Sequence, residues 1–225
     1  PTFYTITSAS KHDSTAMRSI PYEPNAYYIF DRAYDSFKEL YKIHLTDSFY
    51  VVRAKTNLKY KMVKWKRRMP KNVLTDAEVK LTGYLSEKKY PKSFRLIRYY
   101  DEEDDREFVF LTNAKHLSAL DVANLYKKRW LIELFFKWLK QHLKIKRFWG
   151  TTENAVRIQI SVAIITYCLV AIVQHDMQLK RSTYEVLQIL SISLTDKTHL
   201  RDLFDKTNFN DVKDQFSQII PGLFD

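Results

Sequence analysis

The chain has 225 residues, of which 37 are Lys or Arg and 26 are Asp or Glu, so its formal net charge is +11. This excess of positive charge favours a polyanionic partner, with nucleic acid as the first candidate, and a hydrophobic content of 45% excludes a disordered basic tail. Three widely separated glycines cannot build a glycine-rich phosphate loop. The single cysteine, Cys168, excludes an internal disulfide and any multi-cysteine metal site, so a reducing, cytoplasmic setting is expected.

The first third of the chain reads as alternating strands and helices. Strands are expected at residues 2–7, 26–30 and 48–54, where β-branched and aromatic residues gather. Between the last two, residues 36–44 repeat apolar side chains at helical spacing. A strand, a helix and a second strand at this spacing predict a βαβ unit, and hence a parallel or mixed sheet.

The following sixty residues change to strands separated by turns. Four strands are expected, at 58–66, 77–81, 94–100 and 107–112, and they predict an antiparallel β insertion. The acidic run at 101–105 lies between the last two strands. Consecutive acids could bind a metal ion, but a run of like charges between two strands is more typical of a solvated hairpin tip.

Helices are expected throughout the second half. The first is predicted from Ser118 to about residue 143, because Ser118 and Asp121 have the spacing of a capping box. The second follows Gly150 and contains the apolar run 160–173. This run is shorter than the about 20 residues that span a bilayer, so a buried helix is predicted. The tail, residues 181–225, is expected to hold one or two amphipathic helices, at 184–190 and 200–204.

Four polar side chains share one stripe of the first long helix, within about 60° at 100° per residue: Tyr126, Arg129, Glu133 and Lys140. Most other positions around them are apolar, and such a helix is expected to be packed on most sides. A lone carboxylate on it is costly to bury without a partner or a metal ion. The plain alternative is an exposed i, i+4 pair of Arg129 and Glu133.

Asp31 is the obvious second acid, because it directly follows the apolar strand at 26–30. In open α/β sheets, ligands gather at the carboxyl ends of strands. An Asp in this position also commonly starts a turn, so alone it indicates little. Together, Asp31 and Glu133 could hold a divalent ion while nearby cations bind phosphate oxygens.

A second basic region covers residues 57–71, with seven Lys or Arg and no acid, interleaved with Tyr60 and Trp65. Such a strand can follow DNA phosphates while an aromatic ring stacks on a base. The alternative is a sheet edge that lysines protect from pairing with another chain. The sequence leaves both interpretations open.

The pattern Tyr126-x2-Arg129-x3-Glu133-x6-Lys140 resembles the Tyr-Arg-Glu-Lys signature of a large family of bacterial insertion-sequence DDE transposases, the family numbered four. Residues 30–34 resemble that family's second-aspartate motif, and residues 8–14 resemble the piece that precedes it. Residues 149–159 are similar to the segment after its catalytic helix. The resemblance extends over nearly the whole chain.

The resemblance implies an α/β fold: an RNase H-like mixed sheet with an antiparallel β insertion, followed by long C-terminal helices. Residues 1–54 would form part of the catalytic core and residues 55–115 the insertion. Residues 116–180 would resume the core with the catalytic helix and the apolar helix. Residues 181–225 would form a helical tail.

The implied activity is that of a cut-and-paste DNA transposase, which cleaves strands at the ends of its element and transfers them to target DNA. Asp31 and Glu133 would be the second and third catalytic acids and the metal ligands of two Mg²⁺ ions, with Mn²⁺ as the alternative ion. The residues that would contact DNA are Tyr126, Arg129 and Lys140, with Arg53 and Lys55 as weaker candidates. The expected partners are double-stranded DNA, as element end and as target, and a second copy of the chain on that DNA. No membrane is expected, and the setting would be the bacterial cytoplasm at the nucleoid.

The family's first aspartate lies upstream of the part that Pro1 begins. The chain is therefore expected to be an N-terminally truncated portion that binds metal poorly and does not cleave DNA by itself. The alternative function is a non-catalytic DNA-binding protein that could inhibit an intact transposase. An RNA-binding module is less favoured, because the sequence has no RNP-like aromatic motif and no GXXG loop.

Overall fold

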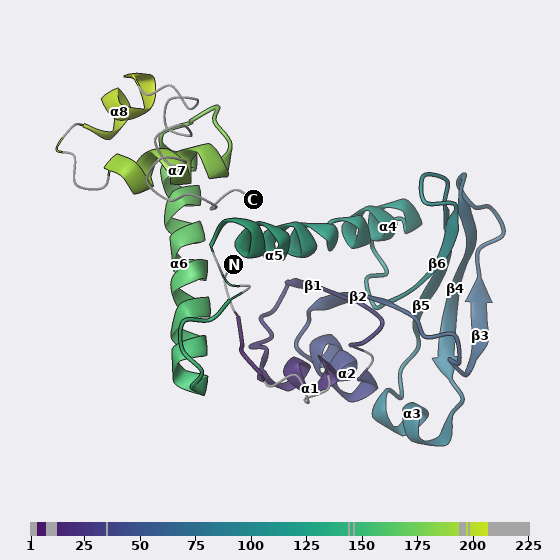
Figure 1. Ribbon diagram of the computed structural model, residues 1–225. Helices are drawn as coiled ribbons and strands as arrows, with labels where there is room; N and C mark the ends of the chain where they lie inside the picture. The colour runs from purple at the N-terminus through teal and green to yellow at the C-terminus, as the bar shows by residue number, and fades with distance from the viewer. Residues whose placement is uncertain are drawn as a thin grey trace. The chain divides into compact units, whose positions relative to one another are not determined.

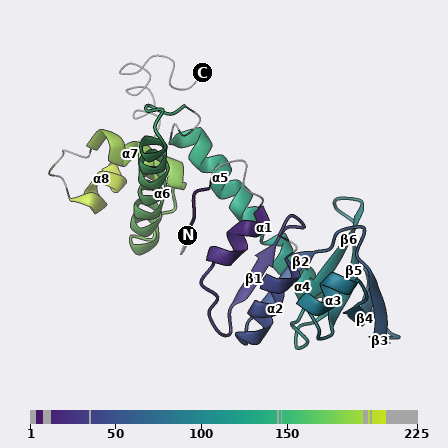
Figure 2. The ribbon, with the colours of Figure 1, turned by 90° about the horizontal axis from the view of Figure 1, so that it is seen from below.

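The computed structural model describes residues 4–7, 13–34, 36–143, 145, 147–193, 197 and 199–206. The chain divides into two units, which we call the sheet unit, residues 2–133, and the helical unit, residues 134–225 (Figures 1 and 2). Residues 4–7 have no regular structure, so the strand expected at 2–7 is wrong over these four residues, and residues 2 and 3 lie outside the described part.

The sheet unit is built on one mixed sheet of six strands in the order β1-β2-β6-β5-β4-β3. β1 and β2 are parallel, and every other neighbouring pair is antiparallel. All four strands expected between residues 58 and 112 are present, and the predicted mixed sheet is confirmed. The strands are β1 (Tyr27–Phe30), β2 (Phe49–Arg53), β3 (Tyr60–Trp65), β4 (Val73–Leu81), β5 (Phe94–Asp101) and β6 (Arg106–Thr112).

β6 joins the antiparallel strands to the βαβ part of the same sheet. It pairs with β2, with Val51 opposite Thr112, and it pairs with β5 on its other side. The helix expected at 36–44 is present as α2 (Phe37–Leu45) and connects β1 to β2. Three short elements were not expected from the sequence: α1 (Asp13–Ala16), the 3₁₀ turn η1 (Met17–Ser19) and α3 (Tyr84–Lys89).

Two apolar cores lie on opposite faces of this sheet, because successive side chains of a strand point to opposite sides. In β2, Tyr50 and Val52 pack in the core that contains Leu40 of α2. Val51 packs instead in the core that contains Val122 of α4 (Ala119–Lys127). Figure 1 shows α2 and α4 on either side of the sheet. The α4 face is the one that carries the candidate site.

The long helix expected from Ser118 to about residue 143 is wrong, because it is two helices, α4 and α5 (Trp130–His142). The predicted capping box is confirmed: the Ser118 hydroxyl accepts from the backbone N–H of Asp121, and the Asp121 carboxylate accepts from the backbone N–H of Ser118. The helices separate where the Arg129 N–H bonds to the carbonyl of Tyr126, three residues back, at 3.0 Å. Bonds of this i to i−3 type make a tighter 3₁₀ turn, which interrupts the α-helical ladder.

The expectation that this helix is packed on most sides is also wrong. Trp130, Leu131 and Ile132 are each more than half exposed, and Leu139 is the buried residue that α5 contributes. An apolar helix face is buried only where another element covers it. Within the sheet unit, no described element covers these three residues of α5.

The helical unit continues with α6 (Glu153–Asp176), α7 (Thr183–Ser193) and α8 (Leu200–Lys206). Thr152 is the N-cap of α6, because its hydroxyl accepts from the backbone N–H of Ala155 at 3.2 Å. The helices expected at 184–190 and 200–204 are both present. α6, α7 and α8 share a small apolar core that contains Val170, Val186 and Phe204.

The prediction that α6 is a buried helix is wrong. Only Ala163, Ile164 and Val170 are buried among its residues, and 17% of its most apolar 18-residue window is buried. With 24 residues, α6 is also longer than its apolar run, so its length and composition would allow it to cross a membrane. One helix of this kind is weak evidence for a membrane span, because the core helices of soluble proteins meet the same criteria of length and composition.

Candidate active site

Asp31 reaches the α4 face because of where β1 ends. Phe30, the last residue of β1, packs in the core on the α2 face, so the next side chain points to the other side. Asp31 Oδ1 accepts a hydrogen bond from its neighbour's backbone N–H, Arg32, at 2.7 Å. It also accepts one from the Tyr126 hydroxyl of α4, at 3.3 Å. Asp31 thus starts a turn, which is the common role of an Asp after a strand. It also faces the polar stripe of α4 and α5 through its contact with Tyr126.

One guanidinium contacts both predicted acids. Arg129 Nη2 donates to Glu133 Oε1 at 2.6 Å, and Arg129 Nη1 lies 3.9 Å from Asp31 Oδ2. Both carboxylates are well exposed, at 41% for Asp31 and 43% for Glu133, whereas the arginine between them is 24% exposed. The buried Arg129 Nε has no hydrogen-bond partner. The i, i+4 pair of Arg129 and Glu133 is therefore present, but Arg129 is partly buried and also contacts Asp31.

The charge of Arg129 is stabilised by its acidic neighbours. Partial burial by itself lowers the pKa of the guanidinium, but the hydrogen bond that it donates to Glu133 and the charge of Asp31 more than offset this effect, so the pKa is raised. A cation held between two carboxylates in this way can be displaced by a divalent cation, which satisfies the same negative charges.

Tyr126 forms part of the floor of the site. Its side chain is buried, and its ring packs against Phe110 at a centroid distance of 4.8 Å. Burial, and next the nearby Asp31 carboxylate, raise the pKa of the Tyr126 hydroxyl. The hydroxyl therefore keeps its proton at neutral pH and acts as a hydrogen-bond donor.

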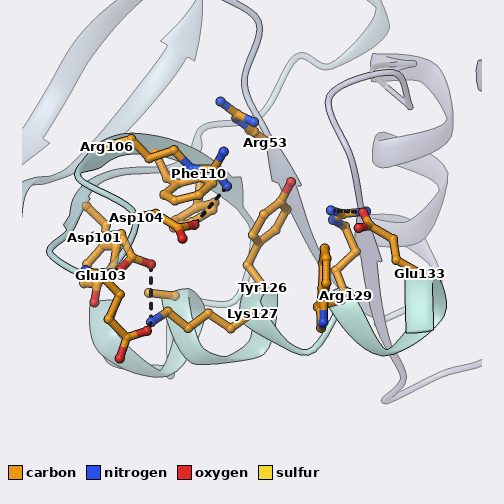
Figure 3. Close-up of a pocket in the computed structure, with 14 residues that line it drawn as sticks. Arg53, Asp101, Glu103, Asp104, Arg106, Phe110, Tyr126, Lys127, Arg129 and Glu133 are labelled. Carbon is orange, nitrogen blue, oxygen red and sulfur yellow. Dashed lines mark hydrogen bonds and ion pairs between the residues drawn. The ribbon is translucent and has the colours of Figure 1, made fainter. Parts of the chain in front are cut away.

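A cavity of about 630 Å³ opens beside these residues, between the ends of β2, β5 and β6 and the α4–α5 segment. Figure 3 shows its charged side chains around an aromatic floor. Its lining includes Glu133 of the acid pair, and it includes the aromatic residues Phe108, Phe110, Tyr126 and Trp130 and the cations Arg53, Arg106, Lys127 and Arg129.

The acidic run expected to be a hairpin tip connects β5 to β6 as a turn. Its first member, Asp101, is buried, whereas Glu103 is 85% exposed. Lys127 lies 3.3 Å from Asp101 Oδ2 and 3.1 Å from Glu103 Oε2. The tip is therefore a solvated turn, and it also supplies anions to the cavity (Figure 3).

The remaining predicted DNA-contacting residues lie in different places. Arg53 ends β2 at the cavity, with its guanidinium 5.0 Å from the centre of the Phe108 ring. Lys55 lies two residues further along the chain and lines two smaller pockets that Arg53 also lines. Lys140 lies on α5 seven residues after Glu133, in the helical unit.

The acid pair has the donor type of a magnesium site but not a full ligand set. Carboxylate oxygens are the ligands that Mg²⁺ prefers in proteins. In the described part of the chain, however, no group of three or more His, Cys, Asp or Glu side chains is gathered as a metal site requires. Asp31 and Glu133 therefore fit a divalent ion in the chemistry of their donors, and a complete site would need further ligands.

Arg106 and Lys127 are cavity residues that sequence reasoning did not single out. Arg106, Phe108 and Phe110 alternate along β6, which places them on one face of the sheet, together with α4. That alternation was readable in the sequence. The pairing of β6 with β2, which brings the row next to Arg53, was not.

Comparison with known proteins places these residues in a family. Residues 1–169 match the family model described as "Transposase DDE domain". The chain is 34% identical over 208 residues to "Putative transposase y4zB" of Sinorhizobium fredii, which covers 90% of this chain and 57% of that relative. It is 33% identical over 141 residues to "Probable transposase for insertion sequence element IS5377" of Geobacillus stearothermophilus, covering 62% of this chain and 37% of the relative.

A third relative is "Putative transposase for insertion sequence element IS4SA" of a Synechocystis species, 34% identical over 101 residues, which cover 42% of this chain and 30% of the relative. The chain spans little more than half the length of the Sinorhizobium relative and less of the other two. The family model, by contrast, covers well over half of the chain and includes the whole sheet unit from Thr2 to Glu133. This chain therefore belongs to the family of DDE transposase domains.

Proposed function

We propose that the chain is part of a cut-and-paste DNA transposase with an RNase H-like core, in which Asp31 and Glu133 are two of the three metal-binding acids. The observation that carries the proposal is the contact of one guanidinium, that of Arg129, with both acids. These acids come from elements a hundred residues apart, and both lie within the segment that matches the transposase family. The subtype with the Tyr-Arg-Glu-Lys signature is part of the same proposal.

The chemistry proposed for this site is phosphodiester cleavage and strand transfer. Two Mg²⁺ ions would supply stabilisation of the attacking and leaving oxygens, and Mn²⁺ could replace them. Asp31 and Glu133 would bind these ions through their exposed carboxylates. Once the acids bind metal, Arg129 would be released from them and its fork of N–H donors could bind a DNA phosphate.

The other predicted contacts have complementary tasks. The protonated Tyr126 hydroxyl would donate to a phosphate oxygen near the acids, and Arg53 would bind a phosphate at the sheet side of the cavity. Lys55 and Lys140 would bind the DNA backbone further away. A second copy of the chain on the same DNA would complete the proposed assembly.

The third acid is proposed to come from a part of the protein that precedes Pro1. Two features support this: the relatives are longer than this chain, and no third acid joins the pair among the described residues. With two acids, the 225-residue chain is expected to bind Mg²⁺ weakly and to leave DNA uncut.

The test uses the longer protein that contains this chain, with duplex DNA that carries the element's ends. Glu133→Gln should reduce Mg²⁺-dependent cleavage by more than the about 10–100-fold that loss of an outer-shell partner costs, while DNA affinity does not fall. The matched control is Glu102→Gln, which removes the same charge from an exposed residue outside the cavity. Cleavage by Glu133→Gln at the rate of this control would refute the proposal.

A non-catalytic DNA-binding protein remains the second candidate, and one observation favours it. In this structure Arg129 offsets part of the negative charge of the acid pair without any metal, and the cavity beside it also presents the cations Arg53, Arg106 and Lys127. This alternative predicts salt-sensitive binding without nicking, unchanged by Glu133→Gln.

A further inference from the structure

Two cations of the cavity are held by acids from the tip of the β5–β6 hairpin. Lys127 is paired with Asp101 and Glu103, and the hydrogen bond to Glu103 is the main cause that raises the pKa of Lys127. Arg106 Nη2 lies 3.2 Å from Asp104 Oδ2. All of these side chains line the same cavity (Figure 3).

These pairs are of the kind that another anion can displace. The Lys127 side chain is 45% exposed and that of Glu103 is 85% exposed, and the pair formed by Arg106 and Asp104 is similarly open to solvent. Exposed ion pairs contribute little to stability, because water screens both charges. Loss of the pairs with Glu103 and Asp104 therefore costs the fold little, so both cations can exchange an exposed carboxylate for a stronger ligand while Lys127 stays next to the buried Asp101.

Arg106 also lies close to a cation that has no acid of its own. The guanidinium carbons of Arg53 and Arg106 are 5.0 and 4.3 Å from the centre of the same ring, Phe108, so they lie within about 9 Å of each other. Arg53 makes no ion pair among the described residues. Two like charges this close favour an anion that both can reach, and a phosphate accepts hydrogen bonds from several guanidinium donors.

We propose that Arg106 and Lys127 are further DNA-contacting residues, and that Glu103 and Asp104 occupy them as substitutes for phosphate until DNA displaces the hairpin tip. This inference rests on the proposed function, in that it takes DNA as the ligand of the site. The tip thereby lowers the affinity of the cavity for phosphate, because its carboxylates occupy the two cations.

The experiment measures binding of the 225-residue chain to a fluorescein-labelled duplex of mixed sequence by fluorescence anisotropy, at low and at moderate salt. The double variant Glu103→Gln with Asp104→Asn removes the exposed carboxylate partner of each cation and leaves Lys127 with Asp101 alone. Its matched control is Glu102→Gln with Asp105→Asn, which removes two charges from the same tip without touching the cavity lining. Glu102 is paired with Lys71, and Asp105 accepts from the Tyr100 hydroxyl. Asn tolerates the positive φ of position 105.

The first variant is expected to bind DNA about 3–10-fold more tightly than the unaltered chain, and the control less than about twofold more tightly. Equal gains in the two variants would mean that net charge alone is at work, and would overturn the inference. Absence of DNA binding by the unaltered chain would overturn the proposed function together with it, so the two failures are distinguishable.

A second arm tests the role of Arg106 directly. Arg106→Ala alone should weaken binding about two- to threefold, and the gain from Asp104→Asn should disappear when Arg106 is already Ala. A gain from Asp104→Asn that is the same with and without Arg106 would overturn the inference, because the acid would then act through another group.

Discussion

Two arginine–carboxylate clusters in the sheet unit use the same chemistry in opposite ways. Arg95 binds both oxygens of Asp76, at 2.6 and 2.7 Å, and the two side chains are almost fully buried. Arg129 binds Glu133 at 2.6 Å but reaches Asp31 only at 3.9 Å, its Nε has no partner, and both acids are exposed. The Arg95 cluster is fully hydrogen-bonded and buried, whereas the Arg129 cluster has an unpaired donor and acids exposed to solvent.

The difference separates a positioning device from a candidate ligand site. Arg95 also donates to the carbonyls of Ala114 and Leu117, directly before the Ser118 cap of α4. A buried bidentate pair of this kind fixes the start of α4, and therefore the place of Tyr126 at its end. The cluster around Arg129 leaves donors and acceptors unused, as a site that must exchange its partners requires.

Breaking the buried cluster should have the largest effect. Arg95→Ala leaves the Asp76 carboxylate buried with only the exposed Lys66 as a partner, so the free energy of unfolding should fall by about 3–5 kcal/mol. Glu133→Gln in the exposed cluster should cost less than about 1 kcal/mol. Urea unfolding followed by circular dichroism measures both, and similar losses in the two variants would abolish the distinction.

Low pH should also destabilise the buried cluster, through protonation of Asp76. Burial raises the pKa of Asp76, but its hydrogen bonds from Arg95 and Lys66 more than offset this, so the pKa lies below the usual 3.8. A carboxylate with a lowered pKa in the folded state contributes stability that is full above its unfolded pKa and is lost as the pH falls through the folded value. Unfolding free energy should therefore drop below about pH 4, and it should drop less steeply in Asp76→Asn. An unchanged slope in that variant would show that other carboxylates carry the acid response.

The N-cap of α4 should contribute independently of the buried pair. Ser118→Ala removes the hydroxyl that accepts from the Asp121 N–H and should cost about 1 kcal/mol. Ser118→Asn, which restores an N-cap acceptor, is the control and should lose only a few tenths. If Ser118→Ala weakens DNA binding more than Ser118→Asn does, the start of α4 positions the DNA-contacting residues at its end.

The smallest change in stability is expected from Tyr126→Phe. This substitution removes a long hydrogen bond to Asp31 and leaves the ring packed on Phe110. The free energy of unfolding should therefore fall by about 0.5–1 kcal/mol at most. DNA affinity should fall about two- to fivefold if the hydroxyl donates to a phosphate. Anisotropy and urea titration on the same preparation separate the two effects, and a large loss of stability with unchanged affinity would assign Tyr126 to the fold alone.

The sequence predicted what depends on local pattern. Strand and helix periods located five of the six strands closely and the βαβ unit, and the spacing from Tyr126 to Glu133, with Asp31 after its strand, located the residues that the structure brings together. Long-range pairing is different, because neither composition nor period shows that β6 lies between β2 and β5. Arg106 lines the cavity because of that pairing, so its place there could not be predicted from the sequence.

The break between α4 and α5 and the exposure of the apolar helices were unpredictable for another reason. The break falls at Lys128 and Arg129, where no Gly or Pro signals a turn. Both residues are good helix formers, so their propensity predicts a continuous helix. Apolar content likewise indicates that a surface is able to be buried, and only the neighbours decide whether it is. α6 and α5 show this, with few buried residues despite their composition.

Because a tight turn joins α4 to α5, the number of residues in this segment is as constrained as their identity. The N–H of Arg129 bonds to Tyr126 and that of Ile132 bonds back to Arg129, so the turn has no slack to absorb length. One added alanine after Arg129 would swing everything downstream by roughly 100° and carry Glu133 away from Asp31, although every side chain of the signature survived. Natural insertions should therefore be tolerated on the hairpins of the sheet and purged from these few positions.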